Sequence, residues 1–337
     1  MRFWKSAGVA ALGSDVLSLV RARVRTTAVG SEARRPFRFF LCGDPALVSE
    51  LRVTLLRGHD DSHIPLDAAA TLETIDPLRR PTVMSPDARC VIFLGRPGDA
   101  AGARLDLLTQ LKLPVFVLTV DPNAPAAGSM TAPHPGEIAE HHVTALDREA
   151  LRTRFFPPLI DCCRGIEIAV GRRLPALRET VGVKLTRDAA RSALKVAIAS
   201  AVVDNVPFLG VVLGAMASAG DTVAITAIQI VLLMQIGAAY GKDPDMQRTW
   251  EMLPVLGGGF GWRMLARELS GFIPVAGVAI KGAIAYAGTI VVGEGVTFYY
   301  EHGRHMTKAD AAVLYEEARH NAIATARDVL NRLRKRR

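Results

Sequence analysis

The chain of 337 residues is long enough for two domains, each with a sizeable hydrophobic core. Hydrophobic residues make up 50% of it and aromatic residues only 6%, so most apolar side chains are small or aliphatic, as in closely packed or membrane-embedded helices. The net charge of +8 gathers at the chain ends, and no aromatic-and-basic platform accompanies it. This argues against nucleic acid as a partner and leaves either the anionic cytoplasmic face of a bilayer or solvated tails.

The cysteines suit neither a disulfide framework nor a metal site. Two of them fall on apolar runs expected to be buried strands, and the other two are adjacent in the sequence. A reducing cytosol is the simplest setting for such thiols. The four cysteines are Cys42, Cys90, Cys162 and Cys163.

Residues 1–35 are expected to form an N-terminal amphipathic helix. Ser14 opens the periodic stretch "SDVLSLVRARV" and suits a helix N-cap. Asp15 interrupts the short apolar run and no small-residue cleavage site follows, so the segment is not predicted to be a signal peptide.

Residues 36–150 alternate short apolar runs with helical patterns. "FRFFLCG" and "ARCVIFLG" are continuous apolar runs that end in glycine, which is typical of parallel strands buried on both faces. "LDLLTQLKL" has helical spacing, and "PVFVLTV" and "HHVTAL" are further candidate strands. Strands that alternate with helices at this spacing predict an α/β fold, a doubly wound domain with right-handed crossovers.

The first strand leads through Gly43 into a helix, which is the layout of a phosphate-binding loop. When the pattern G-x-x-x-x-G-K-[ST] is laid from Gly43, Val48 replaces the second glycine, Ser49 the lysine and Glu50 the magnesium-binding hydroxyl. We expect Glu50 to put negative charge at the start of the helix, where a phosphate would otherwise bind. The sequence therefore predicts a degenerate loop that holds no nucleotide cofactor.

Residues Phe37–Leu146 resemble a Ras/Era-like GTPase domain in element order and in partial motifs. "GDPALVSELRVTLL" has the spacing of that family's first loop and helix, and "VTAL" loosely matches its S-A-L turn. Where the family reads guanine with N-K-x-D, this chain has Thr119, Val120, Asp121 and Pro122. The resemblance implies a degenerate P-loop GTPase-like domain without catalytic or nucleotide-binding residues. An ordinary α/β domain and a divergent active GTPase remain as alternatives.

Residues 151–192 are predicted to be a helical linker, since apolar residues recur at three- and four-residue spacing with arginines on the other face. Pro157 and Pro158 break the pattern early, and Pro175 kinks it again. The arginine face suits either the surface of a membrane or plain solvation, and the pattern does not separate the two.

Residues 193–305 are predicted to form an all-helical hydrophobic domain rich in alanine and glycine. "TVAITAIQIVLLMQIGAAYG" runs for about twenty residues without a charge, which just meets the length of a membrane span. Small residues recur every few positions and allow helices to approach closely. "VPFLGVV" and "IPVAGVA" repeat a proline followed by a glycine, as in two related hairpins.

Some residues of this domain are candidates for structural roles. Its ionisable residues must be paired, hydrated or placed at an interface, and Asp221 is expected to cap the helix that follows it. Gln229 is expected to make an interhelical hydrogen bond. The structural candidates are Pro207, Asp221, Gln229, Gly241, Pro274, Gly277, Lys281 and Glu294.

The stretch from about Ala193 to Gly303 resembles a bacterial family, the domain of unknown function numbered 697, which is related to YcjF-like membrane proteins. The resemblance is carried by "DTVAITAIQIVLLMQIGAAYGKD", "GGGFGWRMLARELSGFIPVAG" and "AYAGTIVVGEGVTFYYEHG". It implies membrane association and partnership with a GTPase rather than a reaction. The loop after Gly43 lacks the residues that bind phosphate. The resemblance therefore does not by itself extend GTP-dependent switching to this chain.

Residues 306–337 are predicted to form a basic amphipathic C-terminal helix. We therefore expect a scaffold or regulator that is not an enzyme and holds no cofactor or metal. Its α/β part would lie in the cytoplasm while its apolar helices cross the cytoplasmic membrane or dip into it. The expected partners are membrane lipid, another protein that the resemblance suggests is a GTPase, and a second copy of the chain. The alternatives are an active GTPase coupled to a membrane domain and a soluble helical interaction module.

Overall fold

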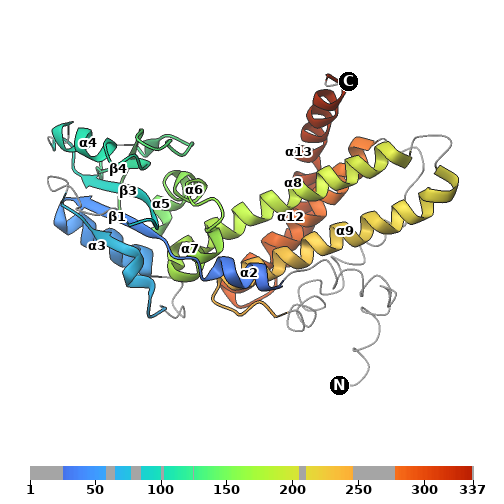
Figure 1. The fold of residues 1–337 in the computed structure, drawn as a ribbon, viewed down its shortest axis with the longest axis horizontal. Coiled ribbons are helices and arrows are strands. Elements are labelled where there is room, and N and C mark those ends of the chain that lie inside the picture. Colours follow the sequence, from blue (N-terminus) through green and yellow to red (C-terminus); the bar gives the residue numbers. More distant parts are fainter. Residues whose placement is uncertain are drawn as a thin grey trace. The chain divides into compact units, whose positions relative to one another are not determined.

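A computed structural model of the chain describes residues 26–57, 65–76, 85–99, 102–123, 125–204, 210–245 and 278–335. The chain forms two compact units, whose elements are labelled in Figure 1. The α/β unit consists of Gly30–Val181 and Ala238–Lys242. The second unit, named here the α8–α13 unit, consists of the described residues of Met1–Val29, Gly182–Gly237 and Asp243–Arg337.

The α/β unit is built around a six-stranded sheet in the described part of the chain. Five strands run parallel, and β5 pairs antiparallel with β6 at one edge. The spatial order is β2-β1-β3-β4-β6-β5, so the parallel strands have the 2-1-3-4-5 order of flavodoxin-like doubly wound sheets. The α/β class predicted from the sequence is confirmed. The strands are β1 (Arg38–Gly43), β2 (Leu72–Thr74), β3 (Ala88–Gly95), β4 (Val115–Val120), β5 (Ala127–Gly128) and β6 (Ile138–Val143).

Aspartates fix where two helices of this unit begin. The Asp44 side chain precedes α3, and Pro45 at the first helical position has the backbone angle that a helix start needs. The Asp147 side chain accepts a hydrogen bond from the backbone N–H of Ala150 and so caps α5. The helical segments as far as Leu177 are α2 (Thr26–Ala33), α3 (Pro45–Leu56), η1 (Ala68–Thr71), α4 (Gly102–Thr109), α5 (Arg148–Arg154), α6 (Phe156–Asp161), α7 (Glu167–Arg173) and η2 (Pro175–Leu177).

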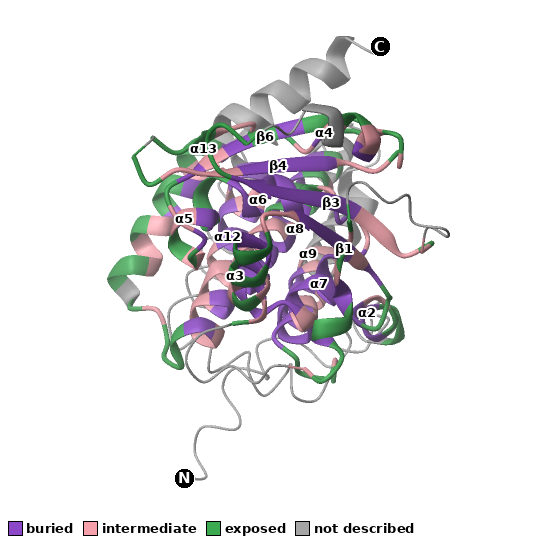
Figure 2. Ribbon diagram, turned by 90° about the vertical axis from the view of Figure 1, so that its left-hand side faces the viewer, coloured by how far each residue is buried: buried purple, intermediate pink, exposed green. Residues whose placement is uncertain are grey.

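Apolar side chains cover both faces of the central strands, because successive residues of a strand point to opposite sides. On one face, Phe40 and Val91 pack with Leu108 of α4. On the other face, Phe116 meets Phe155 edge to face, with ring centroids 5.7 Å apart. Figure 2 shows β1, β3 and β4 buried along much of their length. Burial on both faces explains why these strands are continuous apolar runs in the sequence.

Residues 151–181, most of the segment predicted to be a helical linker, belong to the compact unit that contains the sheet. Phe155, Phe156 and Leu159 are fully buried. These residues recur at three- and four-residue spacing because one face of their helices packs against the core. A linker helix with one apolar face would show the same sequence pattern.

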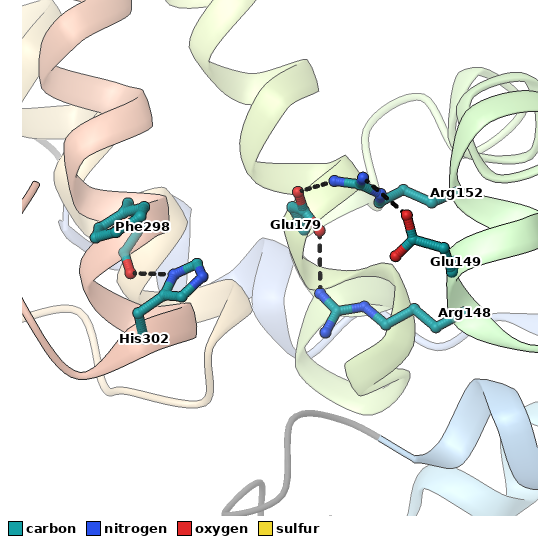
Figure 3. Close-up of polar contacts among 6 residues, drawn as sticks. All are labelled: Arg148, Glu149, Arg152, Glu179, Phe298 and His302. Carbon is teal, nitrogen blue, oxygen red and sulfur yellow. Dashed lines mark hydrogen bonds and ion pairs between the residues drawn. The ribbon is translucent and has the colours of Figure 1, made fainter. Parts of the chain in front are cut away.

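Several arginines near this segment bind within the α/β unit. Arg173 donates through Nε to Asp67 at 2.5 Å and through Nη1 to the carbonyl of Ala33. Glu179 accepts from Arg152 at 2.8 Å and from Arg148 at 3.2 Å, as Figure 3 shows. These arginines are therefore part of the fold of the unit.

The α8–α13 unit contains α8 (Arg178–Asp204, which begins in the α/β unit), α9 (Gly210–Ala239, which ends in the α/β unit), α12 (Val278–His302) and α13 (Lys308–Lys335). Helices α8, α12 and α13 share a buried cluster that includes Ala190, Ala287 and Tyr315. A further cluster joins α8 and α12, with Ile225 of α9 packed against it. Figure 1 shows α8, α9 and α12 side by side.

Glycines set the closest contacts between α8 and α12. A Cβ placed on Gly293 would overlap the side chain of Thr186, and a Cβ on Gly182 would overlap that of Thr297. Each helix thus carries a glycine and, four residues later, a threonine, and each threonine faces the glycine of the other helix. Such small residues let two helices approach closely. We name these residues the glycine–threonine contact.

Gln229 on α9 donates from Nε2 to Oγ1 of Thr289 on α12 at 3.3 Å, which is the interhelical hydrogen bond expected of it. The expectation that Asp221 caps a helix is wrong, because α9 already begins at Gly210 and runs through this position. Gly241 follows α9 with a φ of +84°, a backbone conformation that favours glycine at a helix end.

The remaining structural candidates of this unit are only partly placed. Glu294 lies on α12 and is half-buried. The backbone of Lys281 lies on α12 as well, but its side chain is outside the described residues, as is that of Asp221. Pro207, Pro274 and Gly277 lie outside the described residues altogether.

Within the described residues, no helix is both long enough and apolar enough to span a membrane.

Candidate functional site at the carboxyl edge of the sheet

The strand order places one natural ligand position in the α/β unit. In doubly wound sheets, ligands bind beyond the carboxyl ends of the strands, at the point where the strand order reverses. Here the order reverses between β1 and β3, which are neighbours in the sheet. The residues that follow these two strands are therefore the candidate functional site.

The turn after β1 is closed tightly against β3. Gly43 has a φ of +112°, and a Cβ at this position would overlap the carbonyl of Leu94. The backbone N–H of Asp44 donates to that same carbonyl at 2.9 Å. Only glycine has the conformation and the space that this turn requires.

The side chain of Asp44 occupies the N-terminus of α3. Its Oδ1 atom accepts hydrogen bonds from the backbone N–H groups of Ala46 at 2.8 Å and Leu47 at 3.2 Å. These bonds, together with the nearby Arg96, hold the pKa of the Asp44 carboxyl below its ordinary value. A carboxylate of the chain itself thus takes the backbone donors that a helix start offers to an anion.

The turn after β3 faces the same position. Arg96 lies with its Nε 3.6 Å from Oδ2 of Asp44, and its backbone N–H donates to Oδ2 of Asp99 at 2.7 Å. A Cβ on Gly95 would lie 3.3 Å from the Asp99 carboxylate, so that side chain folds back over the end of β3. In both turns, an aspartate side chain therefore accepts hydrogen bonds from nearby backbone N–H groups.

The residues expected to line a phosphate loop lie elsewhere. Because α3 begins at Pro45, no open loop separates Gly43 from the helix. Val48 is buried against the core, while Ser49 and Glu50 are exposed farther along the helix. The expectation that Glu50 stands at the start of the helix is therefore wrong, and Asp44 carries the negative charge there.

The residues at the expected base-reading motif lie at the same edge of the sheet. Thr119 and Val120 end β4, and the backbone N–H of Asp121 continues the ladder by donating to the carbonyl of Val143 at 2.9 Å. Oδ1 of Asp121 then accepts from the backbone N–H of Asn123 at 2.9 Å, just after Pro122. This carboxylate too is engaged in a local turn.

Sequence reasoning missed that several aspartates gather at the carboxyl edge of the sheet. An aspartate follows each of the first four strands, either directly or within a short turn. These residues were visible in the sequence, but the strand order that brings them to one edge was not. They are Asp44 after β1, Asp76 after β2, Asp99 after β3 and Asp121 after β4.

His141, on β6, is a buried ionisable residue that the sequence pattern did not single out. It is fully buried, with its ring 5.8 Å from that of Phe116 and 5.6 Å from that of Phe155. Neither ring nitrogen has a hydrogen-bond partner among the described residues. Burial, and then the neighbouring His142, lower the pKa of His141 to about 4.

The cysteines are free thiols in positions that disfavour reaction. Burial raises the pKa of Cys42 and of Cys162 to about 12, and it raises the pKa of Cys90 and Cys163 well above the ordinary value. The Cys163 Sγ donates to the carbonyl of Leu159 at 3.2 Å. Thiols held protonated in this way are poor nucleophiles and metal ligands. Within the described ranges, no group of three or more acidic, histidine or cysteine side chains is arranged to hold a metal ion.

Comparison of the chain with models of protein families, with curated proteins and with solved structures finds no match in any of the three.

Proposed function

We infer that this chain is a non-catalytic scaffold or regulatory protein, associated with a membrane through its apolar helices and without a nucleotide site in its α/β unit. The observation that carries the inference is the Asp44 carboxylate at the N-terminus of α3. It lies at the strand-order reversal, where a doubly wound sheet would otherwise accept a ligand.

The charges of the site support this reading. A nucleoside triphosphate is an anion, and its phosphates need backbone N–H groups, a lysine and a metal ion. Here the N–H groups of Ala46 and Leu47 already bind Asp44, and in the adjacent turn the Asp99 carboxylate accepts from the backbone N–H of Arg96. Binding phosphate would require breaking these bonds and bringing like charges together.

The composition of the other unit supports the membrane part of the proposal. Helices α9 and α12 consist mostly of small and aliphatic residues, and the glycine–threonine contact joins α8 to α12. Contacts between small residues are characteristic of helices packed within a bilayer. They also favour a second candidate, a soluble helical interaction module in which the same residues bury one another in water.

Titration of the full chain with a fluorescent GTP analogue and magnesium tests the α/β part. We expect no binding at micromolar concentrations, either to the wild type or to Asp44→Asn, which keeps a capping side chain but removes its charge. Saturable binding to the wild type that unlabelled GTP displaces would establish the rival, a divergent active GTPase. Binding that appears only in Asp44→Asn would show that this charge alone closes the site.

Carbonate extraction of cell membranes tests the membrane part. The proposal expects the chain to remain with the pelleted membranes. Complete release into the supernatant would favour the soluble helical module. This outcome is independent of the nucleotide titration, so each half of the proposal can fail alone.

A further inference from the structure

The last turn of α12 and the link to α13, Phe298–Thr307, carry an aromatic and basic cluster that the proposed function does not use. Three consecutive aromatic residues, Phe298, Tyr299 and Tyr300, are half-buried. The residues that follow, His302 to His305, are exposed. We name residues Phe298–Thr307 the α12 end.

The nitrogen-bearing side chains of the α12 end lie on its aromatic rings. The His302 ring stacks on Phe298 with centroids 4.1 Å apart and planes 19° from parallel, and Arg304 lies 4.9 Å from the same ring. The His305 ring stacks on Tyr299 at 5.1 Å and 14°. Figure 3 shows His302 against Phe298, with Nδ1 at 3.1 Å from the Phe298 carbonyl. The rings thus hold the basic groups in place.

The backbone helps to present this cluster. Gly303 has a φ of +65°, and its N–H donates to the carbonyl of Tyr299 at 2.9 Å, which ends the helix and turns the chain. Glu301, the acidic residue of the α12 end, is buried. The exposed surface of this segment therefore carries basic and aromatic groups without an exposed carboxylate.

A surface of this kind fits the headgroup region of an anionic bilayer. Tyrosine rings are amphipathic and concentrate at that depth, and basic side chains near an anionic surface each strengthen binding about fivefold. The rest of α12, from Val278 to Thr297, is apolar apart from Lys281 and Glu294. Aromatic and basic residues thus gather where a mostly apolar helix ends, as they do at membrane interfaces.

Single-stranded nucleic acid is the other partner that basic and aromatic residues recognise, and the geometry disfavours it. Bases bind by stacking on free aromatic faces. In the α12 end, Phe298 already stacks with His302 and contacts Arg304, and Tyr299 already stacks with His305. A base would first have to displace these groups, whereas a lipid phosphate needs only the exposed guanidinium group of Arg304.

We propose that the α12 end is an interfacial binding surface for anionic phospholipid headgroups. This inference rests on the membrane association proposed above and adds its location and its lipid class. Arg304 supplies the fixed positive charge, the tyrosines supply the amphipathic rings, and the histidines hold their positions by stacking.

Vesicle flotation of the full chain tests the proposal, with vesicles of phosphatidylcholine alone and of phosphatidylcholine mixed with phosphatidylglycerol. We expect the added phosphatidylglycerol to increase binding, and Arg304→Glu to reduce that increase at least about tenfold because it reverses one charge. Arg154→Glu is the matched control, since Arg154 is exposed on α5 of the α/β unit and undergoes the same charge change in a different element of the chain. Arg304→Gln, a milder change, should give a loss of about fivefold.

Each outcome decides a different point. If Arg304→Glu and Arg154→Glu bind anionic vesicles equally well, the α12 end is not the lipid surface, although membrane association stands. If the wild type binds neither kind of vesicle and is released by carbonate, both the surface and the membrane association fall. If the wild type binds single-stranded RNA in place of vesicles and Arg304→Glu abolishes that binding, the partner is nucleic acid. Circular dichroism of each variant establishes that the helices are intact.

Discussion

The two units are packed by opposite kinds of side chain. In the α/β unit, large rings such as Phe39, Phe116 and Phe155 are fully buried around the sheet. In the α8–α13 unit, Gly182 and Gly293 set the contact between α8 and α12. A core of large residues is weakened when atoms are removed, whereas a contact built on glycine is weakened when atoms are added. The same chain should therefore respond to opposite substitutions in its two units.

Phe116→Ala should produce the largest effect. It removes a ring that lies edge to face with Phe155 at the centre of the sheet, and such truncations destabilise a core by about 3–5 kcal/mol. Hydrogen exchange read by mass spectrometry should show faster exchange in β3, β4 and β6. Val53→Ala is the control, because Val53 is 59% exposed on α3 and should change stability by less than about 0.5 kcal/mol. Equal effects of the two variants would mean that the sheet core is loosely packed.

Acid should weaken the α/β unit through His141. The pKa of His141 is about 4 in the folded chain and 6.5 in its ordinary state, so the unfolded chain binds the extra proton first. Stability is therefore complete above pH 6.5 and falls as the pH drops toward 4, by a total of about 3 kcal/mol. Urea unfolding across this range measures the loss.

His141→Leu separates this histidine from the other acid-sensitive groups. The variant removes the titrating ring and keeps an apolar side chain between Phe116 and Phe155, so most of the fall in stability should disappear. If the variant loses as much stability in acid as the wild type, the pH dependence arises elsewhere. Exchange rates in α8 and α12 should change less than those in the sheet.

Gly293→Ala tests the opposite rule in the α8–α13 unit. The added methyl group would overlap Thr186, and overpacking of this kind destabilises by about 1–3 kcal/mol. Gly295→Ala is a close control on the same helix, because a Cβ there meets nothing within 4 Å. Alanine has the higher helix propensity, so Gly295→Ala should stabilise α12 by up to about 1 kcal/mol. Thermal unfolding followed by circular dichroism measures both effects.

A second substitution establishes whether the glycine–threonine contact is the cause. Combining Gly293→Ala with Thr186→Ala removes the hydroxyl and methyl groups of Thr186 and leaves only its Cβ, 2.8 Å from the new methyl group, so part of the lost stability should return. If the double variant is as weak as the sum of the single variants, the two positions do not interact. The close approach of α8 and α12 would then not explain the effect.

The sequence predicted the fold better where its signals are local. The runs "FRFFLCG" and "ARCVIFLG" correspond closely to β1 and β3, since residues buried on both faces form continuous apolar runs. The short strands β2 and β5 were not predicted, because segments of two or three residues carry no periodicity. The order of the strands depends on packing between distant segments, which no local pattern encodes.

At the candidate site too, local features could be predicted from the sequence and contacts between distant segments could not. Asp44 before Pro45 is a recognisable helix start, but the spacing of a phosphate loop was imposed on the same residues and moved the expected charge to Glu50. The unpaired nitrogens of His141 could not be predicted, because the absence of a partner depends on what Phe116 and Phe155 exclude. Gly182 and Gly293 each precede a threonine by four residues, but nothing in the sequence pairs the two stretches.

Asp44→Ala should have the smallest effect on stability and still show what this side chain does. Without the carboxylate, the N–H groups of Ala46 and Leu47 lose their acceptor, and the first turn of α3 should exchange its amide hydrogens several-fold faster. The lowered pKa of Asp44 means that the carboxylate stabilises the fold above the ordinary carboxyl pKa and that this contribution is lost in stronger acid. Asp44→Asn keeps an acceptor without charge, so α3 should exchange slowly in this variant and respond less to acid. Rapid exchange in Asp44→Asn as well would mean that the charge, and not the hydrogen bond alone, holds the start of the helix.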